Sequence, residues 1–380
     1  MYLMRRWTLL ALLLALLLAS SATAQDGFLS EGDIDVDFLF NYYQQDGENS
    51  PVTGGIGTED MDVISPVVAV TWKVDDNWTL RSDIGVDTIS SASVDAIDAE
   101  ISSASAKDAR AFLTIAASRE WSDQTLTLLG GISTEYDYGS AMVGVGWSKS
   151  FNQQNTTVSA QVRHYADTID LYDIDGVNQG EDDRSTTDLT LSISQVLGPR
   201  TVLTGELYFA QQSGYLGTPF HEVILQDGTR VTERLPDDRT RAALGLWLNH
   251  AFSERFVGRF YYRFYDDDWG IQAHTIELEP QFKVSDRLWV FPILRFHSQD
   301  GADYFGLPQT FTGAEDFITA DRDLSEFTSE KYGFGFRKSF APGRSGWTRF
   351  MRSLESRVSF YTREDGLESL SVSIAWGWRF

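Results

Sequence analysis

Apolar and polar residues alternate with a period of two along many short segments of this chain. In residues 369–380, Leu, Val, Ile, Trp and Phe alternate with small or polar residues, and in residues 33–42 apolar side chains alternate mainly with aspartates. Period-two alternation predicts a β-strand that has one apolar and one polar face. We count about sixteen such segments of roughly 10–13 residues, the length that a tilted strand needs to cross a membrane.

The connections between these segments alternate between short and long. The short polar turns fall at 75–77, 122–124, 152–155, 198–200, 253–255 and 285–287. The longer polar segments are 44–60, 88–107, 167–184, 213–238 and 298–329. Short periplasmic turns and long extracellular loops are typical of a transmembrane β-barrel, and an even strand number places both chain ends in the periplasm. Segment 341–353 is the exception, a long periplasmic turn.

Aromatic residues are also divided between the two predicted ends of the strands. Tryptophans fall at the predicted periplasmic ends: Trp72, Trp78, Trp121, Trp147, Trp376 and Trp378. Tyrosines fall near the predicted outer ends: Tyr42, Tyr43, Tyr136, Tyr138, Tyr165, Tyr208 and Tyr265. We interpret these two groups as interfacial girdles. The predicted fold is therefore an all-β, closed antiparallel transmembrane barrel of about sixteen strands.

The N-terminal residues have the pattern of a secretory signal peptide. Arg5 and Arg6 precede the apolar run 9–19, and the small residues at 22–24 form a cleavage site. An uncleaved membrane anchor is the alternative. We predict a signal peptide at 1–24 and a single barrel domain at 25–380, located in the bacterial outer membrane. The terminal aromatic pattern of Trp376, Trp378 and Phe380 resembles the signal that the outer-membrane assembly machinery recognises.

The amino-acid composition narrows the range of functions that this chain could have. The chain has 55 acidic and 31 basic residues, a formal net charge of −24, which disfavours nucleic acid as a partner. It has no cysteine, which excludes disulfides and thiolate chemistry. None of the five histidines lies in a catalytic or metal-binding motif. We therefore expect neither an enzyme nor a bound cofactor.

Several long stretches resemble one known family. They are DTISSAS (87–93), STEYDY (133–138), FNQQNTT (151–157), QSGYLGTPF (212–220), YDDDWGIQAHTIELE (265–279) and LRFHSQDGADYF (294–305). They are similar to a bacterial family of predicted outer-membrane β-barrels, domain of unknown function 3570. The resemblance covers nearly the whole mature chain. It implies the barrel fold and an envelope redox setting, and it assigns no catalytic residue.

Charged residues on the polar face of the later strands are candidates for a constriction. They are Arg263, Glu277, Glu279, Arg295, Arg337 and Arg357. Acids and arginines that face each other across a lumen create a transverse field, as in porins. The alternatives are a salt-bridged network that packs the interior and a substrate-specific site. A lumen enclosed by about sixteen strands is too wide for side chains alone to fill, although inward loops or a partner could plug it.

Two further features lie near the predicted outer rim. Weak candidates for a metal site are Asp266, Asp267, Asp268, His274 and His297. A solvated turn, or a site that bridges lipopolysaccharide phosphates through cations, is the alternative for these aspartates. Within 213–238, residues 222–234 predict a small hairpin. This segment either folds into the lumen or stays in solvent.

The leading functional prediction is a porin-like channel for small polar solutes or ions. The acidic chain favours cations, whereas the inward arginines oppose that preference. The alternative is a scaffold that houses or anchors an envelope partner, such as a periplasmic protein or lipoprotein with a redox role. Segment 341–353, with Arg344, Trp347, Arg349 and Arg352, is a basic and aromatic patch on which such a partner could dock.

Overall fold

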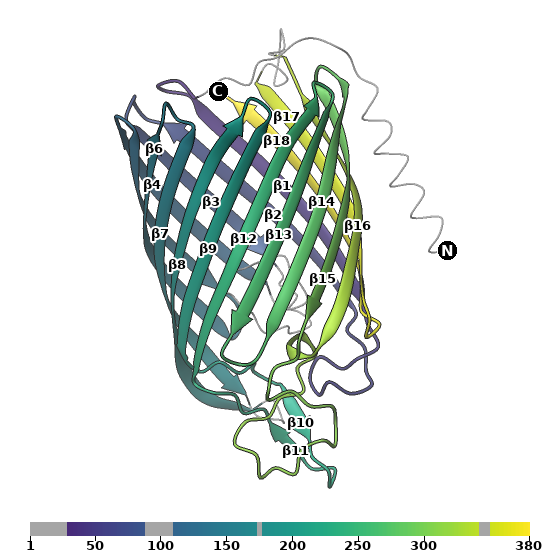
Figure 1. The fold of residues 1–380 in the computed structure, drawn as a ribbon. Helices are drawn as coiled ribbons and strands as arrows, with labels where there is room; N and C mark the ends of the chain where they lie inside the picture. The colour runs from purple at the N-terminus through teal and green to yellow at the C-terminus, as the bar shows by residue number, and fades with distance from the viewer. Residues whose placement is uncertain (1–28, 88–108, 173–176, 342–349) are drawn as a thin grey trace.

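The computed structural model describes residues 29–87, 109–172, 177–341 and 350–380. Within these ranges, sixteen strands form one closed antiparallel barrel, in which neighbours along the chain are neighbours in the sheet (Figure 1). A separate two-stranded sheet interrupts the barrel sequence between β9 and β12. The predicted fold class is therefore confirmed. Among the described residues, no helix is long and apolar enough to cross a membrane.

The barrel strands are 10 to 21 residues long. They are β1 Ile34–Asp46, β2 Met61–Lys73, β3 Trp78–Asp87, β4 Arg110–Trp121, β5 Gln124–Thr134, β6 Tyr138–Phe151, β7 Thr156–Tyr172, β8 Asn178–Gly198, β9 Thr201–Gly214, β12 Asp238–Ser253, β13 Phe256–Asp267, β14 Gln272–Ser285, β15 Leu288–Gln299, β16 Phe327–Ser339, β17 Met351–Arg363 and β18 Glu368–Arg379. The small sheet consists of β10 Glu222–Ile224 and β11 Arg230–Thr232, and η1 Arg322–Leu324 is a 3-10 turn.

The first and last strands close the barrel. β1 pairs with β18 in an unbroken antiparallel register from Asp35↔Arg379 to Asp46↔Glu368. On the outer side of this seam, the rings of Phe38 and Trp376 lie 5.5 Å apart. Because every barrel strand has two hydrogen-bonded neighbours, no open edge leaves unpaired backbone groups in lipid.

The alternation along each strand divides the barrel into two faces. Apolar side chains of the outward face are strongly exposed, among them Ile132 at 62% and Val143 at 65%. Trp72 and Trp121, which the sequence places at the periplasmic ends, are also exposed, at 42% and 39%. Such a belt is stable only when lipid covers it. The residues of opposite parity face the lumen.

The two ends of the barrel differ as predicted. Short turns, the start of β1 and the end of β18 lie at one end, and the long connections lie at the other (Figure 1). One predicted loop is wrong: β7 and β8 continue their pairing through most of 167–184, out to Tyr172↔Asn178. Polar side chains occupy both faces of this extension, so the hydrophobic alternation that reveals a membrane-spanning strand is missing there.

The predicted outer girdle of tyrosines is largely wrong. Tyr138, Tyr165 and Tyr208 are only 8%, 8% and 5% exposed, and their strand parity turns them toward the lumen. Tyr138 accepts a hydrogen bond from Arg184, another inward residue. A tyrosine near a strand end fits either face, and only its parity relative to apolar neighbours decides between them.

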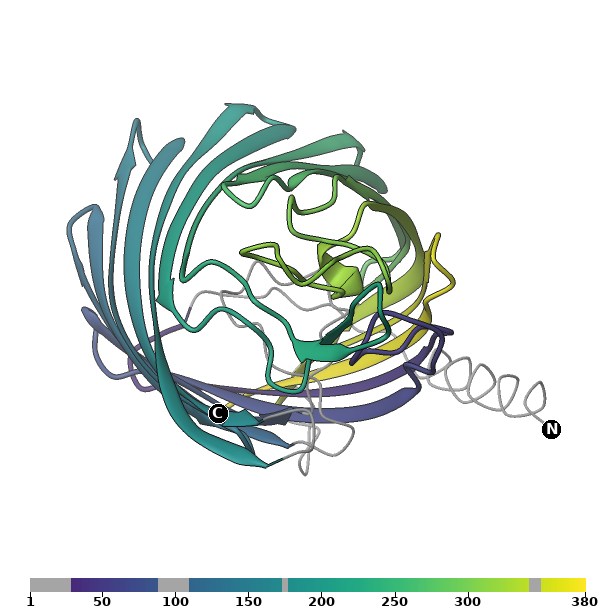
Figure 2. The same ribbon diagram turned by 90° about the horizontal axis from the view of Figure 1, so that it is seen from below.

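Three long loops, 47–60, 215–237 and 300–326, fold together as an outer cap. Figure 2 shows them crossing the barrel mouth on the side of the C-terminal strands. One small core joins β10 to the third loop through Val223, Leu225, Ile318 and Ala320. At Gly54 the backbone has φ 62°, and a Cβ there would lie 2.1 Å from the Ala320 carbonyl oxygen, so only glycine permits this approach.

The hairpin predicted at 222–234 is confirmed as β10 and β11, which pair between Glu222↔Thr232 and Ile224↔Arg230. Its backbone is tied to both other cap loops. Glu222 N–H donates to Val52 O at 2.8 Å, and Gln309 N–H donates to Ile224 O at 2.7 Å. The hairpin is therefore part of the cap, and its sheet does not line the barrel wall.

Candidate functional site

The inner wall of β13 to β17 carries a continuous chain of ion pairs. Glu279 accepts from Arg259 and from Arg357, both at 2.8 Å. Arg357 also contacts Glu355 at 2.7 Å, and Glu355 accepts from Arg337 at 2.6 Å. Glu279 is only 4% exposed, so its two arginines compensate the cost of burying its charge.

The remaining constriction candidates lie on the same wall. Arg295 pairs with Glu277 at 2.8 Å, and Lys331 lies directly opposite Arg295 on the next strand. Arg263 is different, because its Nε is buried and makes no hydrogen bond. The structure therefore brings the six candidate residues together on one wall, where acids and arginines interleave as neighbours.

Basic side chains outnumber carboxylates on this wall. From β9 to β17 the inward basic residues are Arg239, Arg241, Arg259, Arg263, Arg295, Lys331, Arg337 and Arg357. The inward carboxylates are Glu206, Asp267, Glu277, Glu279 and Glu355. Eight positive charges against five negative charges leave an excess of three. Lys283 and Arg363 also face inward, but each pairs with an acid of an end loop and adds no net charge to the wall.

On the rest of the inner wall, acidic and basic side chains pair with each other. Arg163 contacts Asp188 at 3.1 Å, and Arg81 contacts Asp83 at 2.8 Å. At the β1–β18 seam, Asp35 accepts from Arg379 at 2.8 Å. Arg352, the described residue of the predicted docking patch, pairs with Asp37 at 2.6 Å. The other patch residues, Arg344, Trp347 and Arg349, lie outside the described residues.

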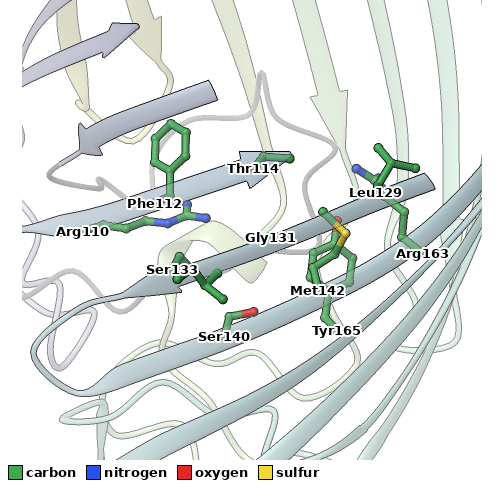
Figure 3. Close-up of a pocket in the computed structure, with 11 residues that line it drawn as sticks. Arg110, Phe112, Thr114, Leu129, Gly131, Ser133, Ser140, Met142, Arg163 and Tyr165 are labelled. Carbon is green, nitrogen blue, oxygen red and sulfur yellow. The ribbon is translucent and has the colours of Figure 1, made fainter. Parts of the chain in front are cut away.

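A shallow recess of about 290 Å³ lies on the inner wall of β4 to β7. Figure 3 shows side chains from these four neighbouring strands around it. Its polar rim includes Arg110, Arg163 and Ser140, and its apolar lining includes Phe112 and Met142. Arg110 and Arg163 already face carboxylates, at 3.9 Å from Glu135 and 3.1 Å from Asp188. The recess is therefore close to neutral in charge.

Charged groups anchor the outer cap to the barrel. Arg363, at the outer end of β17, is 1% exposed in its side chain and contacts Asp323 at 2.6 Å and Asp365 at 2.8 Å. Glu233 accepts from Thr218 N–H at 2.5 Å and from the Thr319 hydroxyl at 2.8 Å. These contacts join the second and third cap loops to each other and to the wall.

One cap carboxyl has a strongly shifted pKa. Burial of Glu59 raises its pKa from 4.5 to about 7. Arg363 lowers this pKa, whereas the negative charges of Asp323, Asp365 and Asp321 raise it further. Glu59 therefore changes its charge near neutral pH, within the packed loops at the barrel mouth.

The metal candidates do not converge. Among the residues that the structure describes, no group of three or more His, Cys, Asp or Glu side chains could hold a metal ion. Asp267 binds Arg239, whereas Asp266 accepts from Gln272. The other three candidates have local partners, since Asp268 accepts from Thr240 N–H, His274 contacts the Tyr262 hydroxyl and His297 contacts Thr275.

The predicted assembly signal lies at the seam that closes the barrel. Trp376 and Trp378 occupy outward positions of β18. Phe380 continues the pairing with Ile34, since each backbone N–H donates to the other's carbonyl, at 2.9 and 3.1 Å. The Phe380 ring stacks on Phe350, with ring centroids 4.9 Å apart.

The sequence does not single out the inward residues Arg241 and Trp247, and it predicts a lipid-facing position for Tyr208, which faces the lumen. Arg241 is 8% exposed and Tyr208 is 5% exposed. Trp247 stacks on Tyr261 with ring centroids 4.8 Å apart. Strand parity could have found them, because Arg241 and Trp247 alternate with the outward residues Leu244, Leu246 and Leu248 on β12, and Tyr208 alternates with Leu207 and Phe209 on β9.

These features define a transmembrane β-barrel with a charged inner wall and a folded outer cap. The chain belongs to the family described as Protein of unknown function (DUF3570), whose model matches residues 98–371. No curated protein matches the chain.

Similar solved structures are outer-membrane barrels of very low sequence identity. The bacterial polysaccharide outer membrane secretin has 10% identity and a TM-score of 0.49, over 91% of this chain and 98% of that one. A BenF-like porin from Pseudomonas fluorescens Pf-5 has 11% identity and a TM-score of 0.45, over 93% and 100%. The CymD monoaromatic hydrocarbon channel has 9% identity and a TM-score of 0.43, over 93% and 89%. At such identities the likeness concerns the fold alone.

Proposed function

We propose that this protein is an outer-membrane diffusion channel for small polar solutes, and that it favours anions. The observation that carries the proposal is the inner wall of β9 to β17, where eight basic side chains stand against five carboxylates. A wall of this kind is polar over its height and needs water or solute beside it. An excess of fixed positive charge in a pore raises the local concentration of anions.

Net charge of the whole chain does not set this preference. The total of −24 includes many acids in turns and loops, among them Asp75, Asp76 and Glu254, which bulk water screens. Fields from exposed charges fall off over about 8 Å at physiological ionic strength. The charges that a permeating ion meets are those on the inner wall. The ion preference of the pore is therefore set by the inward arginines and not by the acidic composition of the whole chain.

The outer cap limits the size of the solutes in this proposal. Its loops cross part of the mouth (Figure 2) and are joined by backbone hydrogen bonds and two small apolar cores. The signal peptide at 1–24 would export the chain, and the outer-membrane assembly machinery would insert it.

Planar-bilayer recording of the refolded mature protein tests this function. A salt gradient across the bilayer should give stable conductance with a reversal potential of the sign for anion selectivity. Cation selectivity would overturn the preference for anions. A barrel that is folded, as judged by heat-modifiable migration, but silent would refute diffusion. That silent barrel would instead favour the scaffold role, tested by co-purification of a periplasmic protein or lipoprotein.

A further inference from the structure

Two arginines of the inner wall have no counter-ion. Among the residues that the structure describes, Arg241 and Arg263 make no hydrogen bond or ion pair, and the Nε of each is buried. Arg241 is only 8% exposed. Burying a guanidinium without a partner is costly, so a position of this kind needs a compensating group.

The carboxylate that acts on Arg241 electrostatically, Asp267, forms no ion pair with it, because its acceptors are already taken. One oxygen of Asp267, Oδ2, accepts from Arg239 at 3.0 and 2.5 Å and from the Tyr265 hydroxyl at 2.7 Å. The other oxygen, Oδ1, accepts from the backbone N–H groups of Trp269 and Ile271, both at 3.0 Å. Two carboxylate oxygens offer about four lone-pair directions, which these five contacts exhaust.

The two arginines adjoin the same two tyrosines. Tyr208 and Tyr265 both contribute to the electrostatic surroundings of Arg241 and of Arg263. The guanidinium of Arg263 lies 5.3 Å from the centre of the Tyr265 ring. The Tyr208 hydroxyl makes no hydrogen bond within the described chain, so it remains able to donate one. Two guanidinium groups and a hydroxyl are donors suited to an oxyanion.

An aromatic surface lies beside Arg263, toward the periplasm. Trp247 stacks on Tyr261, its direct cross-strand partner, with ring centroids 4.8 Å apart. The indole lies over Gly245, where a Cβ would meet two ring carbons at 2.8 and 2.9 Å. A larger side chain at position 245 would therefore displace the indole.

One acid shares this part of the wall. Glu206 is in register with Gly245, which is in register with Arg263, so the indole lies in the row between the two charges. Glu206 and Arg263 influence each other electrostatically and form no ion pair. With Arg239 and Asp267 included, three arginines stand against two carboxylates. The local balance therefore leaves one positive charge.

We propose that Arg241, Arg263 and the Tyr208 hydroxyl bind the carboxylate of an aromatic acid, whose ring lies against Trp247 and Tyr261. This inference rests on the proposed channel function, because it places a solute-binding site within the lumen. The carboxylate supplies the missing counter-ion, and the stacked aromatic pair supplies a flat apolar surface for the ring.

Binding to the mature protein in detergent micelles tests the proposal without any need for conductance. Benzoate is the probe, and its affinity is measured by isothermal titration calorimetry. Arg241→Gln and Arg263→Gln should each weaken benzoate binding by about 10- to 100-fold, the effect expected for a lost hydrogen bond to a charged group. Arg81→Gln removes one positive charge from the wall of β3 and should leave the affinity unchanged.

Trp247→Leu, acetate and inorganic phosphate test the aromatic part and the anionic part of the site separately. Trp247→Leu should weaken benzoate but not acetate, because acetate has no ring. Inorganic phosphate that binds as well as benzoate would overturn the aromatic part of the proposal. Absence of benzoate binding, or equal affinity in Arg263→Gln and in the parent, would overturn the site itself. Heat-modifiable migration verifies that each variant is folded.

The two proposals can fail separately. If benzoate binds as expected while the bilayer stays silent, the site stands and free diffusion fails. If the bilayer conducts with anion selectivity while benzoate does not bind, the channel stands and the aromatic-acid site fails.

Discussion

Replacing Ile318 by alanine should open the outer cap while leaving the barrel intact. Ile318 is 0% exposed and packs with Val223, Leu225 and Ala320, which belong to two different cap loops. Its backbone also exchanges two hydrogen bonds with Arg234, at 2.7 and 2.9 Å. The side chain therefore joins the second and third loops at one point.

The size of the effect follows from the atoms removed. The substitution deletes three carbons, which at about 0.8 kcal/mol per buried carbon is about 2.4 kcal/mol. The residual cavity raises the cost to about 3 kcal/mol, within the usual range for isoleucine to alanine. That free energy corresponds to an increase of about 150-fold in the equilibrium for local opening of the cap.

Amide hydrogen exchange of the protein in micelles measures this change. The Ile318, Arg234 and Gln309 amides, which donate hydrogen bonds between the cap loops, should lose protection by that factor. Amides of the barrel strands should keep theirs, because their pairing does not involve the cap.

Ile56→Ala is the matched control, because Ile56 lies in the first cap loop and is fully exposed, at 101%. Its protection factors should equal those of the parent. The reasoning would be refuted if Ile318→Ala lowered protection by less than tenfold, if Ile56→Ala had an equal effect, or if the barrel strands lost protection together with the cap.

Three other predictions concern the cap, the inner wall and assembly. Glu59 has its pKa raised from 4.5 to about 7, so the stability that it contributes is fully present below pH 4.5 and is lost as the pH rises through about 7. Exchange of cap amides, corrected for the intrinsic rate, should show easier opening at pH 8 than at pH 5, and Glu59→Gln should abolish this difference. Glu279→Gln removes an inner-wall carboxylate that lies between two arginines and should shift the reversal potential toward anions, whereas Glu254→Gln, on an exposed periplasmic turn, should not. Deletion of Phe380 removes two backbone hydrogen bonds with Ile34 and should lower the heat-modifiable fraction in outer membranes, whereas Phe380→Tyr should retain it.

The barrel was predictable because its signals are local. Alternation over residues 33–42 and 369–380 placed the outward faces of β1 and β18, and parity then placed Glu277, Glu279 and Arg295 on the inner wall. A strand that separates lipid from water repeats every second residue, so no distant contact is needed to recognise it. Short turns between such strands followed from the same pattern.

The cap was not predictable, because its contacts join residues far apart in the chain and have no period. The Arg234 guanidinium donates to Glu315 O across 81 positions, and the Arg322 side chain donates to Gly54 O across 268 positions. Only the β10–β11 hairpin, which closes locally around Gly228, left a signal in the sequence. Individual ion pairs could not be predicted from the sequence either, because strand parity tells which face of the barrel a side chain occupies but not which residue it contacts.

The connections between cap and wall favour a fixed constriction over a moving lid. Arg363 bonds Asp323 of the cap at 2.6 Å, and its guanidinium lies 4.9 Å from the Phe327 ring. Arg239 stacks on Trp269 at 4.1 Å, and that tryptophan is 2% exposed in the second apolar core of the mouth. Displacing the cap would break the Arg363–Asp323 pair and expose the buried Trp269 ring, so the packed position of the cap is favoured. Solutes in the proposed channel therefore pass beside the cap, and its edge, together with the basic wall below it, sets what enters.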